Sequence, residues 1–466
     1  MKKAYLLVAT LFCLAAGTAN AQLGLLHTFD GAHGAYPLGS LTMSGKTLFG
    51  MTNAGGANDS GCIFSVDTTG INYKDIFDFT MSKGTYPQEG SLKMAGHKLY
   101  GMTFSGGAND SGVVFSVDTD GTAFKVLLNF NGSNGAQPIG SLVLNGTKLF
   151  GMTYTGGANN YGNVFTIDTA GNNYKDLYDF TSSTGQNPYG DVTIVKDKLF
   201  GTCGAGGVGG YGTVFSIDSN GTNYTDLYDF TGIDGAYPNN ILAYSGTQLF
   251  GMTYGGGANS DGNVFSMDTT GAYFTDLLDL AANVAPEGLY PQGDVVLKGH
   301  ILYGMAELGG ANDSGCIFSV DTNGANYTDL YDFNTGINGN SPYGDVIISG
   351  KGLYGTASAG GLSGYGILFK YNDTATTSVQ PVKNIASVKL YPNPSNGLFT
   401  IQSSVGSGQS SVEVYNALGE QVYKQFTVHS SSFIVDLNNQ PNGIYLYRLI
   451  SETGNLVGEG KLIIQK

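Results

Sequence analysis

Residues that could do chemistry are few in this sequence, and they form no known catalytic motif. The histidines are isolated, so no H-x-x-x-H or H-E-x-x-H zinc pattern forms; they are His27, His33, His97, His300 and His429. A G-x-S-x-G nucleophile elbow is absent. Cys62 and Cys316 occupy equivalent positions of a repeat, which favours buried apolar side chains over ligands. We assign no catalytic residue and expect no cofactor.

Carboxylates are the next candidates, because a pair of them can hydrolyse a glycosidic bond. Most aspartates recur where a turn begins, and such an aspartate hydrogen-bonds its own backbone; they are Asp67, Asp118, Asp168, Asp218, Asp268 and Asp321. Glu89, Glu287 and Glu307 fall outside this repetition. Glu287 and Glu307 come from the same irregular copy of the repeat, where a catalytic pair could form. A polysaccharide-active lyase or hydrolase therefore stays an alternative.

The loop GGANDSG is similar to the calcium-binding nonapeptide G-G-x-G-x-D and is therefore a candidate metal site. That nonapeptide works by stacking turns every nine residues, whereas this loop returns only about every fifty. The acid is also not kept between copies, as GGVGGYG and GGLSGYG show. These differences exclude a calcium ion in every copy, and we assign no metal ligand. A single incidental ion near Asp59, Asp110 or Asp313 stays open.

The composition favours an exported all-β protein. Glycine accounts for 73 of 466 residues and only 12% of the residues are charged, which is typical of many short strands joined by tight turns. The net charge of −15, without any run of Lys and Arg, argues against nucleic acid as a partner. After the leader, no segment approaches the ~20 apolar residues of a membrane span.

A repeat of about fifty residues runs through most of the chain. The pattern Leu-Phe/Tyr-Gly returns seven times; its glycines are Gly50, Gly101, Gly151, Gly201, Gly251, Gly304 and Gly355. Each copy contains four strand-like runs, as in SLVLNG, KLFGMTY, NVFTID and YKDLYDF. Four antiparallel strands per copy predict the blade of a β-propeller. We expect the glycine inside the second run to let neighbouring blades approach closely.

The ends of the repeat region predict how the propeller closes. The outer-strand run, YKDLYDF in the third copy, occurs only six times, because the seventh copy ends at ILFKYNDT without it. At the other end of the region, LLHTFDGAHGAYP (residues 25–37) aligns on LYDFTGIDGAYP. We therefore predict a closed, seven-bladed β-propeller whose N-terminal strand completes the last blade and removes a free edge.

The segments outside the repeat have compositions of their own. Residues 1–21 combine two lysines, an apolar stretch and an Ala-x-Ala site, which predicts a secretory signal peptide. The propeller is assigned to residues 22–371, and the polar stretch 372–385 indicates a linker. Residues 386–466 alternate as short strands with turn signals, which predicts a small Ig-like β-sandwich.

Two family resemblances rest on these motifs. LFGMT, GGANDSG and IFSVD resemble the GloVer tandem-repeat family of secreted bacterial proteins, which implies a propeller and no established activity. The C-terminal segment resembles the type A sorting domain of type IX secretion; the matching residues are Tyr391, Pro392, Asn393, Pro394, Gly397, Gly419, Gly443, Tyr445 and Lys461. This resemblance implies that the type IX secretion machinery is a partner. It also implies a secreted or outer cell-surface location in a Gram-negative bacterium.

One face of the predicted propeller gathers groups that suit a ligand. Its loops carry Tyr36, Tyr86, Tyr237, Tyr290, Asn58, Asn109, Asn159 and Asn312. Planar rings and amide groups suit sugars, although each side chain could instead only shape its loop. We predict a monomeric, non-enzymatic binding module for a glycan or a cell-surface protein. The alternatives are the lyase or hydrolase and a structural or adhesive spacer. Acids crowded into one pocket on this face would favour the enzyme.

Overall fold

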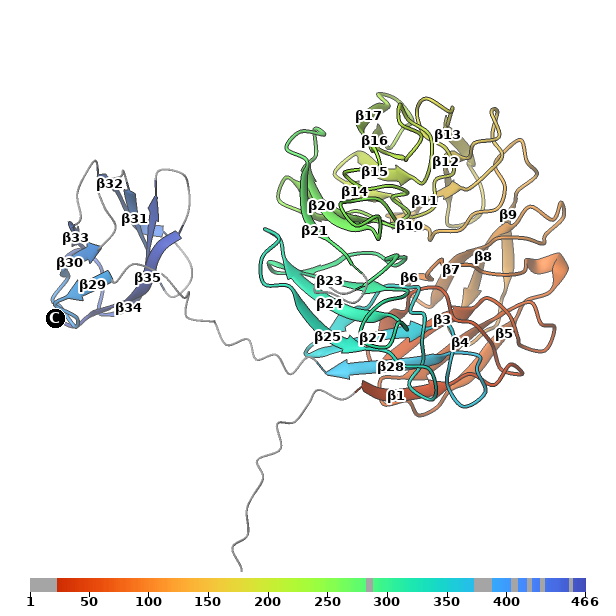
Figure 1. Ribbon diagram of the computed structural model, residues 1–466, viewed down its shortest axis with the longest axis horizontal. Coiled ribbons are helices and arrows are strands. Elements are labelled where there is room, and N and C mark those ends of the chain that lie inside the picture. Colours follow the sequence, from red (N-terminus) through yellow and green to blue (C-terminus); the bar gives the residue numbers. More distant parts are fainter. Residues whose placement is uncertain are drawn as a thin grey trace, which may run out of the picture. The chain divides into compact units, whose positions relative to one another are not determined.

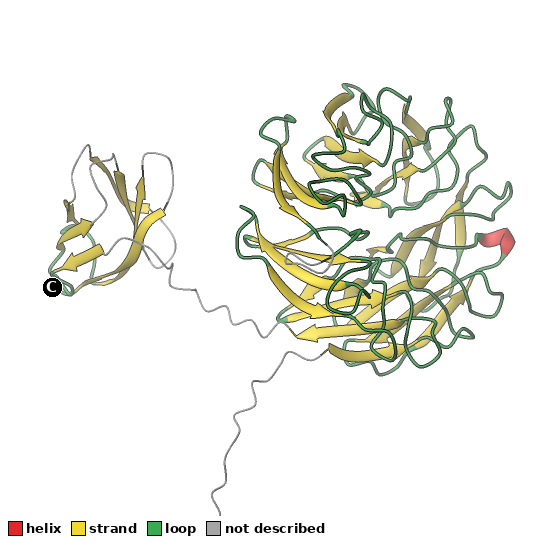
Figure 2. Ribbon diagram, viewed as in Figure 1, coloured by secondary structure: helices red, strands yellow, loops and turns green. Residues whose placement is uncertain are grey.

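The computed structural model describes residues 23–281, 288–372, 388–403, 410–416, 421–427, 432–451 and 456–466. The chain divides into two compact units, Met1–Thr374 and Ala375–Lys466 (Figure 1), and each is described by itself. The predicted signal peptide, Glu287, Gly419 and His429 lie outside the described residues. Figure 2 shows that strands and loops build both units; the short 3-10 helix η1 (Met81–Lys83) stands in the first unit.

Seven four-stranded antiparallel sheets, the blades, make up the first unit. The strands of blades one to three are β2 (Thr42–Ser44), β3 (Thr47–Thr52), β4 (Cys62–Asp67), β5 (Lys74–Asp78), β6 (Lys93–Ala95), β7 (Lys98–Thr103), β8 (Val113–Asp118), β9 (Lys125–Asn129), β10 (Val143–Asn145), β11 (Lys148–Thr153), β12 (Asn163–Asp168) and β13 (Lys175–Asp179). Those of blades four to six are β14 (Thr193–Val195), β15 (Lys198–Cys203), β16 (Thr213–Asp218), β17 (Thr225–Asp229), β18 (Ala243–Ser245), β19 (Gln248–Thr253), β20 (Asn263–Asp268), β21 (Thr275–Asp279), β22 (Val296–Lys298), β23 (Ile301–Ala306), β24 (Cys316–Asp321) and β25 (Thr328–Asp332).

The seventh blade is built from both ends of the repeat region. It contains β26 (Ile347–Ser349), β27 (Gly352–Ala357) and β28 (Ile367–Asn372), and β1 (Leu23–Thr28) is its fourth strand. β1 pairs antiparallel with β28, from Leu23 opposite Tyr371 to Thr28 opposite Ile367, with a bulge between Leu25 and His27. Figure 1 shows the two strands side by side. The predicted seven-bladed propeller with N-terminal closure is confirmed.

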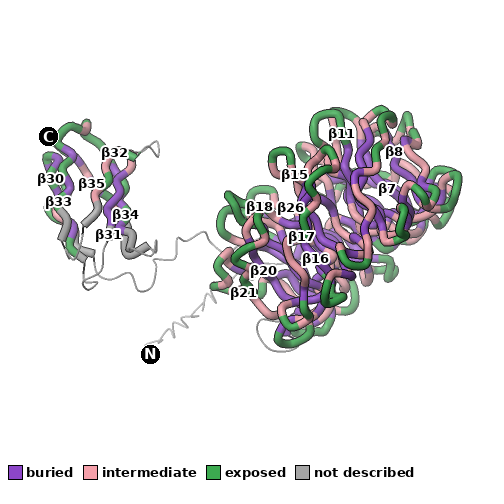
Figure 3. The backbone as a smooth tube through the Cα atoms, turned by 90° about the horizontal axis from the view of Figure 1, so that it is seen from above, coloured by how far each residue is buried: buried purple, intermediate pink, exposed green. Residues whose placement is uncertain are grey.

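The two middle strands of each blade lie inside a continuous core. Leu149, Phe150 and Met152 of β11 are buried, and so are Val164, Phe165 and Ile167 of β12, because neighbouring blades cover both faces of the sheet (Figure 3). Most residues of the outer strands are only half-buried, and apolar and polar side chains alternate along these strands. The core therefore runs from blade to blade rather than within one sheet.

The glycine of the second strand makes room mainly for an aromatic ring of its own blade. Gly251 pairs with Phe265 across β19 and β20, and a Cβ on Gly251 would lie 2.6 Å from Phe265 Cζ. We expected the approach of a neighbouring blade instead. A neighbouring blade does approach the glycine at Gly201, where Met152 Sδ of the preceding blade would lie 3.5 Å from an added Cβ.

A methyl group at this position is expected to destabilise the propeller. Gly251→Ala would press on the buried Phe265 ring and should cost about 1–3 kcal/mol of unfolding free energy. Gly255→Ala is the matched control, because its Cβ would have no neighbour closer than 3.8 Å. Denaturant titration of the two variants checks this difference, and equal stabilities would contradict the steric account.

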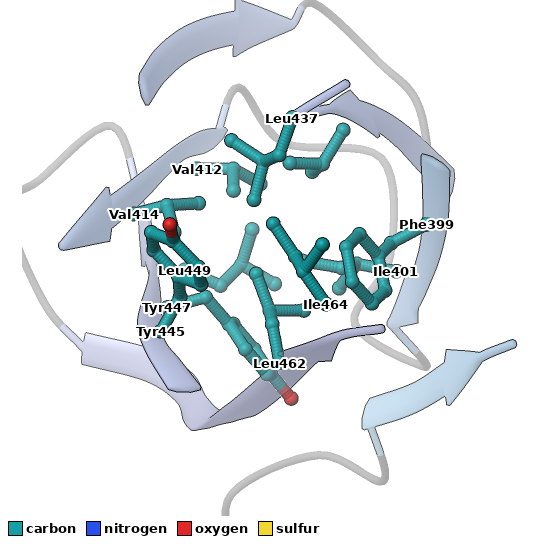
Figure 4. Close-up of a cluster of buried hydrophobic side chains, with 11 residues drawn as sticks. Phe399, Ile401, Val412, Val414, Leu437, Tyr445, Tyr447, Leu449, Leu462 and Ile464 are labelled. Atoms are coloured by element: carbon teal, nitrogen blue, oxygen red, sulfur yellow. The ribbon is translucent and has the colours of Figure 1, made fainter. Parts of the chain in front are cut away.

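The second unit contains two small antiparallel sheets. Their strands are β29 (Val388–Tyr391), β30 (Leu398–Ser403), β31 (Ser410–Tyr415), β32 (Gln421–Thr427), β33 (Ser432–Asp436), β34 (Gly443–Ser451) and β35 (Leu456–Ile464). The sheet orders are β29-β30-β33 and β32-β31-β34-β35. Phe399 and Ile401 of the first sheet meet Val412, Leu449 and Leu462 of the second in one core (Figure 4). The fold class predicted for this part, a small β-sandwich, is confirmed.

Candidate functional site

A pocket on the axis of the propeller is the candidate functional site. Its cavity volume is about 30 Å³, and the figure rises to about 340 Å³ only when the open solvent at its entrance is included. Every blade contributes to its wall, through the residues that precede the innermost strand; the lining residues are Ser40, Glu89, Gly140, Ser141, Tyr189, Gly190, Asp191, Asn239, Gln292, Gly293, Asp294, Tyr343 and Gly344. Since all seven blades meet only around their common axis, the pocket is the mouth of the central channel.

The backbone around this axis packs closely because the repeat places glycine there. A Cβ on Gly90 would lie 2.8 Å from the carbonyl oxygen of Gly140 in the next blade. Backbone amides also bond to the next blade: Ser91 N donates to Ser141 Oγ (2.7 Å), and Asp345 N donates to Ser40 Oγ (3.0 Å). Side chains before each of these glycines therefore lie at the mouth, and side chains after them lie deeper.

Two glutamates from distant blades meet at the mouth. Glu89 precedes the inner strand of blade two, and its Oε1 accepts a hydrogen bond of 2.6 Å from Tyr189 of blade four. Glu307 follows β23 of blade six, and its two oxygens accept from Tyr343 Oη (2.9 Å) and Gln292 Nε2 (3.1 Å). The mouth therefore holds two carboxyl groups, each fixed by a phenol.

Burial raises the pKa of Glu89 to about 7, and the nearby charge of Glu307 adds to this rise. The hydrogen bond from Tyr189 works in the opposite direction. Burial and the two carboxylates raise the pKa values of Tyr189 and Tyr343, so both phenols stay protonated and donate. A carboxyl group whose pKa lies near 7 can act as a general acid or base at neutral pH.

A deeper ring contains three aspartates. Asp191 is buried, its Oδ2 lies 3.8 Å from Lys93 Nζ, and its Oδ1 accepts from the Ser141 amide. Asp294 Oδ1 accepts from the Ile241 amide at 2.7 Å. Burial raises the pKa of Asp345 to about 7; it also raises that of Asp294, where the charges of Asp345 and Asp191 add to the effect. Part of this ring is therefore protonated near neutral pH.

The stability of the propeller is expected to fall as the pH rises from 5 to 8. Glu89 has a pKa of about 7 when folded and an ordinary value of 4.5 when unfolded, so the folded state binds more protons in this window. Asp345 acts in the same direction. Glu89→Gln mimics the protonated side chain and should flatten the fall of Tm measured by differential scanning fluorimetry.

The matched control for this pH dependence is Asp120→Asn. Asp120 lies on an exposed turn, where the Thr122 hydroxyl lowers its pKa, so it does not titrate between pH 5 and 8. An equal fall of Tm in the native protein and in Glu89→Gln would contradict the assignment of the proton to Glu89.

The predicted tyrosines lie on the same end of the propeller as the pocket. Tyr36, Tyr86 and Tyr237 are 41%, 41% and 45% exposed, while Tyr290 is half-buried and stacks on Tyr254 at 5.0 Å. All four have a positive φ of 54–57° directly before a proline. Tyr86 N donates to the carbonyl of Ser60 in the preceding blade, so the loops that carry these rings join neighbouring blades.

The predicted asparagines lie farther out, at the tips of the loops between second and third strands. The Nδ2 groups of Asn58, Asn109, Asn159 and Asn312 donate to the carbonyls of Phe79, Phe130, Phe180 and Phe333 at 2.9–3.0 Å. Each amide thus ties its loop to the residue that follows the outer strand. The structure places the four tyrosines and the four asparagines on one face. Along the sequence, the tyrosines are the closer of the two sets to the residues that line the pocket.

The residues at the pocket were only partly foreseen. A pair of Glu307 with Glu287 was only one possibility, and Glu287 lies outside the described residues. The partners of Glu307 in the structure are Tyr343 and Gln292. Tyr189, Asp191 and Asp294 were missed. The available signal was the place where the repeat breaks, since the triplet before the inner strand changes from EGS to YGD, NNI and QGD while its surroundings repeat.

Metal and membrane features are limited in the part of the chain that the structure describes. No group of three or more His, Cys, Asp or Glu side chains there is arranged to hold a metal ion. No helix within the same residues has the length and apolar character to cross a membrane.

In the sorting-domain segment, the motif residues fix the last strand. Asn393 Nδ2 donates to the Lys461 carbonyl (2.8 Å), and Asn393 Oδ1 accepts from the Ile463 amide (2.8 Å). The Tyr445 hydroxyl donates to the Pro441 carbonyl at 2.9 Å. Tyr391, Pro392 and Pro394 are exposed beside Asn393, and Gly397 has a φ of 123° next to Asn438. Gly443 begins β34 opposite Ile464.

Comparison with known proteins places both parts of the chain. The family model described as Gloeobacter/Verrucomicrobia repeat matches residues 9–208, 86–253 and 242–407, and the one described as Secretion system C-terminal sorting domain matches residues 389–465. A curated relative is ulvan lyase NLR42 of Nonlabens ulvanivorans, 37% identical over 95 residues. That match spans 20% of this chain and only 17% of the lyase.

Solved structures with a similar arrangement are distant in sequence. A fungal alcohol oxidase of the AA5 family shares 12% identity with a TM-score of 0.47, over 96% of this chain and all of that one. The extracellular domain of a B. thetaiotaomicron protein assigned to the hybrid two component systems shares 11% identity with a TM-score of 0.48, over 96% of this chain and 59% of that one.

The repeat matches cover well over half of the chain, and the sorting-domain match covers its C-terminal segment. The chain therefore belongs to the Gloeobacter/Verrucomicrobia repeat family and is a β-propeller protein that its type IX sorting domain directs to the surface or the surroundings of a Gram-negative bacterium.

Proposed function

We propose that the propeller is a non-enzymatic module that binds glycans on the face around the axial pocket. The observation that carries this proposal is the set of exposed tyrosines, Tyr36, Tyr86 and Tyr237, on the end of the propeller where the pocket opens. Aromatic rings stack on the apolar faces of sugars, and the carboxyl, amide and phenol groups of the pocket can bond hydroxyls. Export to the cell surface brings such a face into contact with polysaccharides.

The charges of this face favour neutral or basic glycans. Glu89 lines the mouth, and Glu307 contacts the lining residues Tyr343 and Gln292. Residues 1–447 contain no arginine, the side chain best suited to bind carboxylate and sulfate groups. An anionic polysaccharide would meet like charges there. The 95-residue likeness to an ulvan lyase therefore does not define the ligand.

Loss of one exposed tyrosine is expected to weaken glycan binding. Tyr86→Ala should reduce the affinity for a bound oligosaccharide about tenfold, since an aromatic contact contributes about 0.5–1.5 kcal/mol beyond its area. The matched control is Tyr273→Ala, because Tyr273 is 83% exposed and stands in the turn at the opposite end of a blade. Calorimetric titration with a panel of neutral oligosaccharides checks this, and equal losses in both variants would contradict the assigned face.

A glycoside hydrolase or lyase is the second candidate, favoured by Glu89 in the pocket and by Glu307 near enough for its charge to act on Glu89. Glu89, with its pKa of about 7, has the protonation range of a general acid, and Glu307 is the second carboxyl group near it. Both are held by phenols that would first have to release them. Reducing ends or unsaturated products released by the native protein, and lost in Glu89→Gln with binding retained, would establish the enzyme.

A further inference from the structure

Acceptor oxygens without a partner gather at the axial pocket. Gln292 Oε1, Asp345 Oδ1 and Asn240 Oδ1 are buried and accept no hydrogen bond. Gln292 lines the pocket, and Asp345 follows Gly344 of its wall. The Asn240 amide donates to the carbonyls of Gln292 and Gly293, so it lies against the same wall. Buried acceptors of this kind are costly when left unpaired, and a ligand that completes the site should donate hydrogen bonds.

The charge of the pocket also favours a ligand that donates hydrogen bonds. The lining groups Glu89, Asp191 and Asp294 are carboxyls, and Asp345 lies beside Asp294. The carboxylate of Glu307 accepts hydrogen bonds from the lining residues Gln292 and Tyr343. Within the described residues, Lys93 is the one lysine or arginine with an ion pair to this set, and it lies 3.8 Å from Asp191 and 3.0 Å from Ser91 Oγ. The charge of Lys93 also reaches Asp294 and Asp345 of blades six and seven, but among the described residues its ion pair is with Asp191. A cationic donor would satisfy both the charge and the unpaired acceptors.

A metal ion fits these oxygens less well than an ammonium group. A calcium or magnesium ion needs several oxygens converging at 2.0–2.6 Å, and the described residues contain no group of three acids so arranged. An ammonium group has three donors and reaches oxygens at ordinary hydrogen-bond distances. It also gains from aromatic rings, which Tyr189 and Tyr343 supply at the mouth. The geometry points to the primary ammonium group of an amino sugar as the part of the ligand that enters the pocket.

This inference rests on the proposed glycan binding and specifies its substrate class. The exposed ring of Tyr86 stands three residues before Glu89 along the chain. A sugar ring stacked at the rim can therefore direct its amine toward the glutamates, while the remaining sugars stay on the face. N-acetylation removes the charge and two of the three donors, so an acetylated sugar should lose this contact.

The test compares oligosaccharides of glucosamine with the matching oligosaccharides of N-acetylglucosamine, by calorimetric titration of the full mature chain at pH 7. The free-amine form should bind at least about tenfold more tightly, as expected for hydrogen bonds to charged groups. The double variant Glu89→Gln, Glu307→Gln keeps the shape of the mouth and should lose this preference while it still binds the acetylated form. Asp168→Asn, on an exposed turn at the other end of a blade, should keep the preference.

A third ligand, butylamine, separates this inference from the proposed function. Binding of butylamine and of neither sugar series would support the ammonium site and overturn glycan binding. Equal affinity for the two sugar series, without any effect of the double variant, would overturn the ammonium site and leave glycan binding standing. Stabilisation by Ca²⁺ with no response to any amine would overturn the ammonium site in favour of a metal site. No binding of any ligand would overturn both.

Discussion

Removal of Leu23–Phe29 is expected to lower the Tm of the propeller by about 10 °C or more and to make it associate. The deleted segment supplies β1, which forms the outer edge of the seventh blade. Five residue pairs with β28 disappear, together with the buried side chains of Leu23 and Phe29. At about 1 kcal/mol for each backbone hydrogen bond and about 2 kcal/mol for each buried side chain, this loss is a large fraction of ordinary stability.

Association follows from the edge that the deletion exposes. β28 would present unpaired backbone groups and the buried side chains of Ile367 and Phe369, and such an edge is a template for pairing with another chain. His27 of β1 also stacks on Tyr73 of the first blade at 3.6 Å, so the contact that joins the two ends of the ring is lost. The propeller therefore changes from a closed ring to an open one.

A control variant and a peptide test whether the loss of β1 itself causes this result. Leu25→Thr is the matched control, because Leu25 is 43% exposed on the same strand and threonine is a good strand former. A synthetic peptide of residues 22–30 should restore the Tm of the deleted chain, since an added strand can complete an open sheet. Light scattering and thermal melts give both readouts. A deleted chain that stays monomeric with an unchanged Tm would contradict the closure.

The repeat explains why the fold could be predicted so fully. Strand β1 was found from one short alignment, in which Phe29 takes the place of Phe230, and both side chains are fully buried in the structure. Each blade repeats the same residue types because each buries the same faces against its neighbours. The bulge at Leu26 of β1 also repeats, because the equivalent Leu177 of β13 and Leu227 of β17 are likewise left unpaired in their outer strands.

The pocket could not be predicted in the same way, because it is made where the copies differ. Glu89 and Tyr189 are 100 positions apart, and only closure of the ring brings blades two and four together at the axis. Sequence proximity pointed only to a possible pair of Glu307 with Glu287 of its own blade, and Glu287 lies outside the described residues. Asn58 illustrates the other limit: an amide that could bind a sugar and an amide that holds the Phe79 carbonyl are the same residue type.

Replacement of Leu462 and Ile464 by aspartate is expected to stop export of the whole protein. Both side chains lie in the core of the sorting domain, with exposures of 0% and 2%, and they contact the strands of both sheets there. Two unpaired charges in that core would cost several kcal/mol each, more than a domain of about eighty residues has in reserve. The sorting domain should unfold, and the type IX machinery would lose the structure that it recognises.

The propeller should fold normally in this double variant, because its sheets share no strand with those of the sorting domain. We therefore expect the protein in the periplasmic fraction with the Tm of the native propeller, and at least about tenfold less of it at the surface and in the medium. Gln465→Asp is the control, since Gln465 is exposed directly after the same strand. Fractionation with immunoblotting measures the distribution. Normal surface display of the double variant would mean that the last residues are recognised as a linear signal, and that the contacts by which Asn393 holds Lys461 and Ile463 serve the fold alone.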